Sequence, residues 1–268
     1  MYDTTQRRLV PRGKHAPGGF TLVEIAVVIA IVALLLGALL APLATQYSLR
    51  KNKEGERALS SIKEALLGFA VSNSGRLPCP DSDDDGVIDG NEDLDGGGPP
   101  PGCLETEGIL PWQTLGIFPA DPWGRLYRYQ VTQEFAYEAR TGQPPGALQL
   151  DLSDPGTLTV QTRLDDKTAA DMTQTAVAVV WSTGANGHGG RQLGITTTLA
   201  PPASGTDEEI NYSTSVSPTS YMLRVQTPVA GGCDDTTLAQ PYCEFDDLVI
   251  WISAPELFNR LVQAGLLP

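Results

Sequence analysis

The strongest hydrophobic pattern in the chain is a continuous apolar segment from Ile25 to Ala41, close to the start of the sequence. A short basic leader precedes it, and one carboxylate, Glu24, stands at its edge. Because about 20 apolar residues are needed to cross a bilayer, we expect residues 20–41 to span a membrane. An ionised carboxylate is costly in such a segment, so its presence indicates that Glu24 has a role there.

Beyond this segment, the apolar residues follow a helical period. Four of them recur at spacings of three and four, namely Leu59, Ile62, Leu66 and Phe69. This stripe predicts that one long helix continues to about Ser72 and packs on a folded domain. Glycine and proline follow at residues 75–80 and should end it. We therefore expect a helix over residues 20–73 and a domain over residues 74–268.

The domain contains several patterns that are typical of β-strands. Alternating or apolar runs predict strands at residues 127–131, 148–152, 158–164, 176–181, 221–225 and 248–252, with a hairpin turn near residues 154–156. A capping box opens at Ser253 and predicts a last helix with Leu257, Leu261 and Ala264 on one face. Trp112 and Trp123 favour core packing, with a ligand platform as the alternative. The predicted fold class is α+β, a long N-terminal helix packed on an antiparallel sheet.

The charge of the chain is strongly negative. It carries a formal net charge of −14, and residues 1–19 contribute +3 through four basic residues and Asp3, so the remainder carries −17. Such a surface argues against binding to a phosphate backbone, and we expect no nucleic-acid partner for the domain as a whole. The acidic residues are concentrated between residues 81 and 95, which suggests a local cation site.

Twelve residues within this acidic loop match the spacing of a calcium-binding loop. Oxygen ligands fall at positions 1, 3, 5, 9 and 12, and glycine stands at position 6, where the chain must turn sharply. The predicted ligands of Ca²⁺ are Asp81, Asp83, Asp85, the Val87 carbonyl, Asp89 and Glu92. Pro80 argues against an entering helix, so we expect an isolated loop of the extracellular kind. The alternative is a solvated acidic loop with accidental spacing.

The chain has four cysteines, an even number, which permits three disulfide connectivities. We favour Cys79–Cys103 and Cys233–Cys243, because each pair closes a local loop. Zinc is the alternative, but no CxxC motif occurs and the chain has only two histidines.

The N-terminal residues carry a resemblance to a known family. The sequence Gly18-Gly19-Phe20-Thr21-Leu22-Val23-Glu24, followed by the apolar segment, resembles the class III signal of type IV pilins and type II secretion pseudopilins. The resemblance implies that a prepilin peptidase removes residues 1–19 by cutting after Gly19, and then methylates Phe20. It also implies that Glu24 pairs with the Phe20 amine of a neighbouring subunit. An ordinary signal anchor with a chance glutamate is the alternative.

The same resemblance implies a location and further partners. The leader would lie in the cytoplasm and the domain in the periplasm of a single-pass protein of the bacterial inner membrane, or at the cell surface after assembly. Partners would be the lipid bilayer before assembly, an inner-membrane assembly platform, and other pilin or pseudopilin subunits.

Two further segments resemble the major pseudopilin. Residues 121–129 resemble its DPWG-x-x-Y-x-Y segment, which opens the first strand of its sheet. The glycine-rich residues 182–190 resemble its calcium-binding loop. Here the acidic partners Asp207, Glu208 and Glu209 are displaced by an insertion, so a flexible loop is favoured over a second calcium site. His188 is interpreted as a loop residue.

These patterns favour a minor pilin or pseudopilin subunit that acts by assembly. A calcium-dependent adhesin or binding domain anchored by the pilin helix is the alternative. We expect no enzymatic activity, because the sequence has no GxSxG or HExxH motif and no pair of histidines in the domain.

Overall fold

The computed structural model describes residues 19–82, 88–95, 102–136, 155–195, 197–212 and 219–267, without the side chains of residues 38–45. The chain divides into two units, Met1–Leu49 and Arg50–Pro268. The long helix α1 (Leu22–Ser72) contributes residues to both units. The predicted end of this helix, at about Ser72, is confirmed.

In the first unit, α1 exposes its apolar side chains. Leu22 is 87% exposed and Leu34 is 74% exposed, and each described side chain from Phe20 to Gly37 belongs to the exposed class. Within the described residues, no helix is both long enough and apolar enough to cross a membrane. The span predicted over residues 20–41 is therefore not confirmed.

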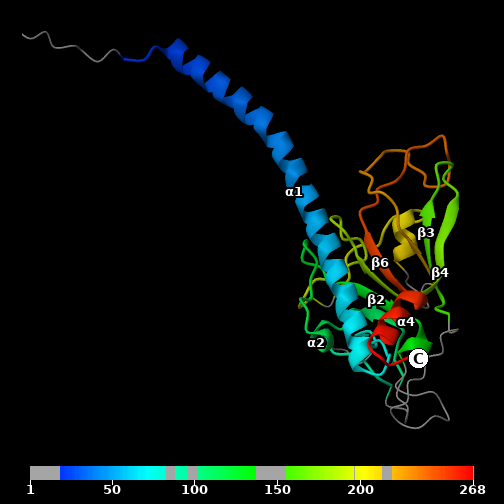
Figure 1. Ribbon diagram of the computed structural model, residues 1–268. Helices are drawn as coiled ribbons and strands as arrows, with labels where there is room; N and C mark the ends of the chain where they lie inside the picture. Colours follow the sequence, from blue (N-terminus) through cyan, green and yellow to red (C-terminus); the bar gives the residue numbers. More distant parts are fainter. Residues whose placement is uncertain are drawn as a thin grey trace, which may run out of the picture. The chain divides into compact units, whose positions relative to one another are not determined.

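The described strands of the second unit form one sheet of six strands (Figure 1). They are β1 (Glu107–Ile109), β2 (Arg128–Val131), β3 (Leu158–Arg163), β4 (Ala169–Ser182), β5 (Ser220–Met222) and β6 (Leu248–Ser253). Their order is β1-β2-β4-β3-β5, and β6 pairs with β4. The α+β prediction is confirmed.

One strand pair corrects the prediction of a purely antiparallel sheet. β5 runs parallel to β3, whereas the other pairs are antiparallel, so the sheet is mixed. Two parallel strands need a long crossover between them. Here the chain passes from β3 through β4 and the short helix α3 (Asp207–Asn211) before it reaches β5. The predicted strand at residues 148–152 lies outside the described residues, and the partner of β3 across the nearest turn is β4.

The long strand β4 organises the sheet. Its second half pairs with both β2 and β6, and its first half pairs with β3. An irregularity between Ala176 and Ala178 changes the alternation of its side chains. Beyond it, Ala178 and Val180 join the core on one face, while Val179 and Trp181 join the core on the other.

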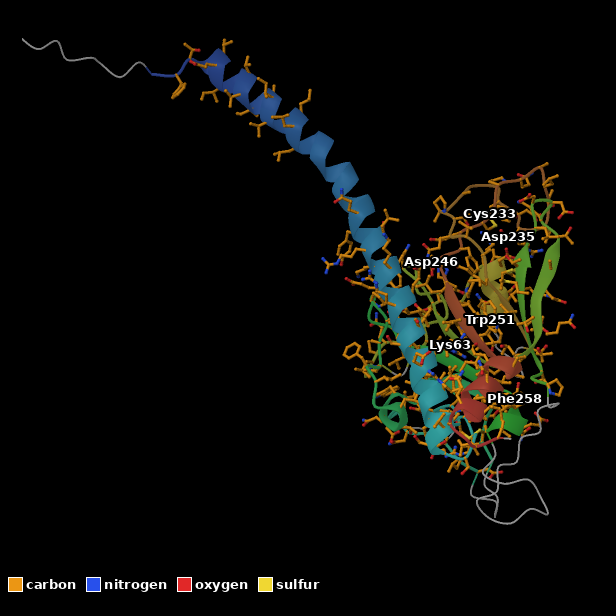
Figure 2. All side chains as sticks on the ribbon, viewed as in Figure 1. Lys63, Cys233, Asp235, Asp246, Trp251 and Phe258 are labelled. Carbon is orange, nitrogen blue, oxygen red and sulfur yellow. A yellow bond between two sulfur atoms is a disulfide. The ribbon has the colours of Figure 1, made fainter. Side chains whose placement is uncertain are left out.

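The larger core lies between the sheet and the helices of this unit. Leu59, Ile62 and Leu66 of α1 are buried in it, as predicted, whereas Phe69 is only half-buried. The last helix, α4 (Ala254–Gln263), adds Leu257, Phe258 and Leu261. An ion pair of 2.7 Å joins Lys63 to Glu256, and Figure 2 locates Lys63 and Phe258 on their helices.

The predicted capping box of α4 is only partly correct. Ser253 does precede the helix, but its side chain makes no capping hydrogen bond. Ala264, expected on the apolar face, is exposed. Gly265 ends the helix with a φ of 74°, in the left-handed region that favours glycine.

The positions of both tryptophans are consistent with the predicted core packing. Trp112 opens the short helix α2 (Trp112–Leu115) and is buried against Ile109 and Leu126. Trp123 is partly buried and packs against the larger core. A 3₁₀-helix at Gln133–Phe135 adds Phe135 to that core.

The two predicted disulfides are confirmed. Cys79 pairs with Cys103, with a Cα–Cα distance of 5.2 Å, and Cys233 pairs with Cys243, with a Cα–Cα distance of 4.8 Å.

Candidate functional site

The predicted calcium loop is described only in part. Asp83, Asp85 and Val87 lie outside the described residues. Of the other predicted ligands, Asp81 accepts a hydrogen bond of 2.6 Å from the Gly90 amide, and Asp89 accepts two from Asn91. These contacts belong to the loop itself.

Glu92, the predicted bidentate ligand, already has a cationic partner. Its carboxylate accepts hydrogen bonds of 2.6 and 3.0 Å from the guanidinium of Arg76, and one of 3.1 Å from the amide of Cys79. Arg76 and Glu92 are both largely buried. Because this pair is neutral as it stands, Glu92 fits a calcium ion only if it exchanges its bond to Arg76. Calcium at this loop stays a prediction.

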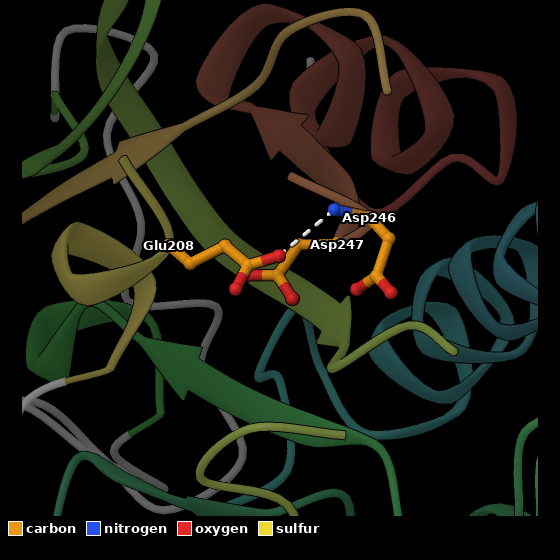
Figure 3. A group of neighbouring side chains, drawn as sticks. All are labelled: Glu208, Asp246 and Asp247. Carbon is orange, nitrogen blue, oxygen red and sulfur yellow. Dashed lines mark hydrogen bonds between the residues drawn. The ribbon is translucent and has the colours of Figure 1, made fainter. Parts of the chain in front are cut away.

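A second group of carboxylates is formed by residues from the C-terminal part of the chain. Glu208 of α3 meets Asp246 and Asp247, which immediately precede β6 (Figure 3). One oxygen from each lies within 4.8 Å of the others. We call these three residues the acid cluster. Its oxygens are the donors that a hard divalent cation prefers, so it is the place among the described residues where a metal ion could be held.

Neighbouring polar groups hold the acid cluster in place. Glu208 accepts hydrogen bonds from the side-chain amide of Asn186 and from the backbone amide of Asp246. The His188 ring lies 3.3 Å from the same carboxylate. Asn186 also donates its backbone N–H to Asp246 Oδ2, and Asn211 donates to Asp247 Oδ2. His188 is thus a loop residue that contacts the cluster.

The two aspartates of the cluster are difficult to ionise. Burial raises the pKa of Asp246 to about 7, and the negative charges of Glu208 and Glu244 act in the same direction. Burial also raises the pKa of Asp247 well above its ordinary value, with Glu208 adding to the effect. Asp246 Oδ1 is buried and has no hydrogen-bond partner among the described residues. A proton or a cation would relieve this repulsion.

The glycine-rich loop beside the cluster is fixed by an arginine. Arg125 donates hydrogen bonds to the carbonyl oxygens of Gly184 and Ala185, at 2.7 and 3.0 Å. Gly184 has a φ of 59°, and a Cβ atom there would come within 2.1 Å of Asp246 Oδ1. Only glycine fits both the backbone conformation and the close approach. The loop expected to be flexible is therefore tied down by specific contacts.

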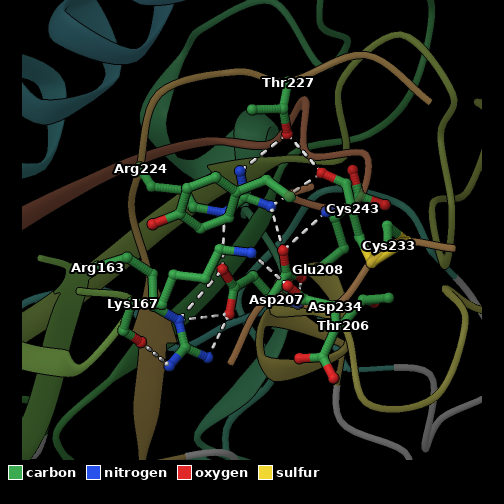
Figure 4. A network of polar contacts seen from close by, with 12 residues as sticks. Arg163, Lys167, Thr206, Asp207, Glu208, Arg224, Thr227, Cys233, Asp234 and Cys243 are labelled. Atoms are coloured by element: carbon green, nitrogen blue, oxygen red, sulfur yellow. Dashed lines mark hydrogen bonds and ion pairs between the residues drawn. A yellow bond between two sulfur atoms is a disulfide. The ribbon is translucent and has the colours of Figure 1, made fainter. Parts of the chain in front are cut away.

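A buried network of charges ties α3 to β3 and to the segment before β6 (Figure 4). Asp207 accepts hydrogen bonds from the guanidinium groups of Arg163 and Arg224, both at 2.6 Å. Asp235 accepts from Arg224 at 3.1 Å and from the backbone amides of Asp207 and Cys243. We call Arg163, Asp207, Arg224 and Asp235 the charge network. It fixes α3, and therefore positions Glu208 in the acid cluster.

The N-terminal residues have a simple geometry. Gly19, Phe20 and Thr21 precede the first turn of α1 and are not helical. The carbonyl of Thr21 accepts the Ile25 N–H at 3.2 Å, which is the first bond of the helix. Glu24 lies in the first turn, where the positive end of the helix dipole favours a carboxylate. Phe20 is 77% exposed, so the Gly19–Phe20 bond lies at an accessible position.

One protein-family model matches this N-terminal part of the chain. Residues 15–40 match the model of the prokaryotic N-terminal methylation motif. The chain carries a prepilin-type methylation motif. This motif is the class III signal of type IV pilins and pseudopilins, and it implies processing by prepilin peptidase and assembly with other pilin subunits.

The prepilin-type motif covers a small part of the chain. The folded unit that follows lies outside the matched residues, and no curated protein and no solved structure matches the chain significantly. The motif points to a membrane-anchored precursor of a structural subunit. The folded unit therefore has no match among these comparisons.

Sequence reasoning found the residues of the prepilin-type motif, but it missed two of the three members of the acid cluster. The sequence places Glu208 among acidic residues that an insertion displaces from the glycine-rich loop, and so does not favour it as a ligand. Asp246 and Asp247 are not predicted as site residues, although an adjacent pair of acids before an apolar strand is a usable signal. Arg125 lies within residues 121–129, which resemble the pseudopilin segment, but its bonds to the glycine-rich loop are not predicted from the sequence.

Proposed function

We propose that the chain is a minor pilin or pseudopilin, a subunit of a type IV pilus or of a type II secretion pseudopilus. The observation that carries this proposal is the prepilin-type motif at residues 15–40, which includes the exposed apolar first part of α1. A helix that is apolar on all sides is not stable in water by itself and needs lipid or other helices around it. A bundle of identical helices provides such surroundings.

The proposed mechanism is assembly. Cleavage after Gly19 by prepilin peptidase creates a new amine at Phe20, which is then methylated. Glu24 of one subunit neutralises the Phe20 amine of a neighbour, which favours one axial register, because an unpaired charge is costly in an apolar bundle. The inner-membrane assembly platform would add such subunits one at a time.

The folded unit would remain outside the helix bundle, in the periplasm or at the cell surface. There the disulfides, and calcium bound at the loop of residues 81–92, would keep exposed segments ordered. The size of the folded unit supports a minor or terminal position, since a repeating subunit must fit against copies of itself on all sides.

Mass spectrometry of the protein from its native membrane tests the proposal. The expected result is a mature chain that starts at N-methylated Phe20, and a Gly19→Ala variant that stays uncut. Glu24→Ala should be cut normally but should enter filaments poorly. An uncut wild-type chain, or a cut beyond Ala41, would contradict the proposal.

A further inference from the structure

The first turn of α1 contains a hydrogen bond that the assembly mechanism does not use. Thr21 Oγ1 accepts the backbone N–H of Glu24 at 3.2 Å. The first N–H groups of a helix have no partner within the helix, and a threonine directly before the helix satisfies one of them. Thr21 is therefore the N-cap of α1.

The sequence around this bond is that of a capping box, Thr-x-x-Glu. In a complete capping box, the glutamate side chain bonds back to the N–H of the capping residue. Here only the threonine half is formed, and the Glu24 carboxylate has no partner among the described residues. The cap thus fixes the backbone of Glu24 while its side chain remains available.

We propose that Thr21 is a positioning residue for Glu24 in subunit assembly. Its hydroxyl keeps the first turn helical, and so directs the Glu24 carboxylate outward to the Phe20 amine of a neighbouring subunit. This inference rests on the proposed function, because it concerns the same pair of groups.

The N–H groups of the first turn and the amine of a neighbouring subunit compete for the Glu24 carboxylate. Without the hydroxyl, the Glu24 N–H loses its partner and joins the other N–H groups of the first turn, and an unpaired N–H is costly in an apolar environment. The carboxylate of Glu24, which the positive end of the helix attracts, can then bond back to the N–H groups of its own first turn. A carboxylate that bends back to its own helix is lost to the neighbouring amine.

Two single substitutions separate the hydroxyl from the shape of the side chain. Thr21→Val keeps the branched shape and removes the acceptor, whereas Thr21→Ser keeps the acceptor. An N-cap substitution of this kind changes a helix equilibrium about fivefold. We therefore expect Thr21→Val to lower the fraction of mature chain found in filaments about fivefold, and Thr21→Ser to stay within about twofold of the wild type.

The measurements use the full chain in its native host. Cleavage is followed by the mass of the mature chain, filament content by immunoblot of serial dilutions, and the folded unit by its melting temperature. Thr21→Val should leave cleavage and melting temperature unchanged. Combined with Glu24→Gln, it should cause no additional loss, because a residue that acts only through Glu24 has nothing further to position.

The outcomes distinguish this inference from the proposed function. Normal filament content of Thr21→Val would overturn the inference alone, as would slower cleavage, which would make Thr21 a recognition residue for the peptidase. Failure of Thr21→Ser to restore assembly, or an added loss in the double variant, would also overturn it. If the wild-type chain is neither cut at Phe20 nor found in filaments, the proposed function and the inference both fail.

Discussion

Asp246 shows how one buried carboxylate can make the stability of this protein depend on pH. Its backbone follows Phe245, a fully buried residue, and its side chain faces Glu208 and the glycine-rich loop. Because the folded protein holds a proton that the unfolded chain releases, the folded state loses stability as pH rises through the interval between the two pKa values. The acid cluster is therefore sensitive to pH near neutrality.

A melting series over pH tests this point. The pKa of Asp246 is about 7 in the folded protein and near 3.8 without its surroundings, so its contribution to stability should fall between about pH 4 and pH 7. Asp246→Asn cannot ionise. With a chelator present, its melting temperature should rise relative to the wild type across this interval and stay higher above pH 7.

The control is Asp165→Asn, on the exposed turn between β3 and β4. It should follow the wild type at each pH. If the difference between Asp246→Asn and the wild type were independent of pH, Asp246 would not titrate in this interval.

Helix α1 shows how one element combines two kinds of contact. Along residues 55–70, one face of the helix packs in the core and the other face is exposed. Two glycines of the same helix therefore have different surroundings. At Gly55 a Cβ atom would lie 2.5 Å from Leu248 Cδ1, whereas at Gly68 it would meet nothing within 4 Å. Gly55 therefore permits the close approach of α1 to β6.

Alanine at these two glycines gives a matched comparison within one helix. Both substitutions gain about the same helix propensity, roughly 1 kcal/mol. Only Gly55→Ala also forces Leu248 to move, and overpacking of this kind costs about 1–3 kcal/mol. Denaturant unfolding should find Gly55→Ala less stable than Gly68→Ala by about that amount. Equal stability would show that Leu248 repacks without cost.

The element scale also shows what sequence patterns can predict. The end of α1 at Ser72, the two disulfides and most strands were predictable, because each depends on neighbouring residues or on a local loop. The parallel pairing of β5 with β3 was not, since no local pattern reports where the chain returns after a long connection. The acid cluster was missed for the same reason, because Glu208 and Asp246 are brought together only by the fold.

At the scale of the whole molecule, strong negative charge makes divalent cations a natural source of stability. A ligand that binds only the folded state stabilises it in proportion to the logarithm of its concentration. Extracellular calcium modules bind with dissociation constants of about 10⁻⁴–10⁻³ M. At a concentration about 100 times the dissociation constant, the gain is about 2.7 kcal/mol.

Calcium titration of the full chain in detergent tests both acidic regions together. We expect 10 mM calcium to raise the melting temperature by about 5–10 °C relative to chelator, as this gain implies for a unit of this size. The paired change Asp81→Ala and Asp83→Ala should abolish the rise if the loop of residues 81–92 binds the ion. A rise that survives there but disappears in Asp247→Asn would assign binding to the acid cluster. If the wild type had the same melting temperature with calcium and with chelator, neither region would be a calcium site.

The charge network has a consequence for how the folded unit responds to salt. Its two arginines and two aspartates balance each other, and all four are largely buried, with side-chain exposures from 0 to 11%. Mobile ions screen exposed charges over about 10 Å at an ionic strength of about 0.1 M, but they screen buried pairs much less. The link between β3, α3 and the Cys233–Cys243 loop should therefore hold at low and at high salt alike, while repulsion between the exposed acidic groups of the chain varies with salinity.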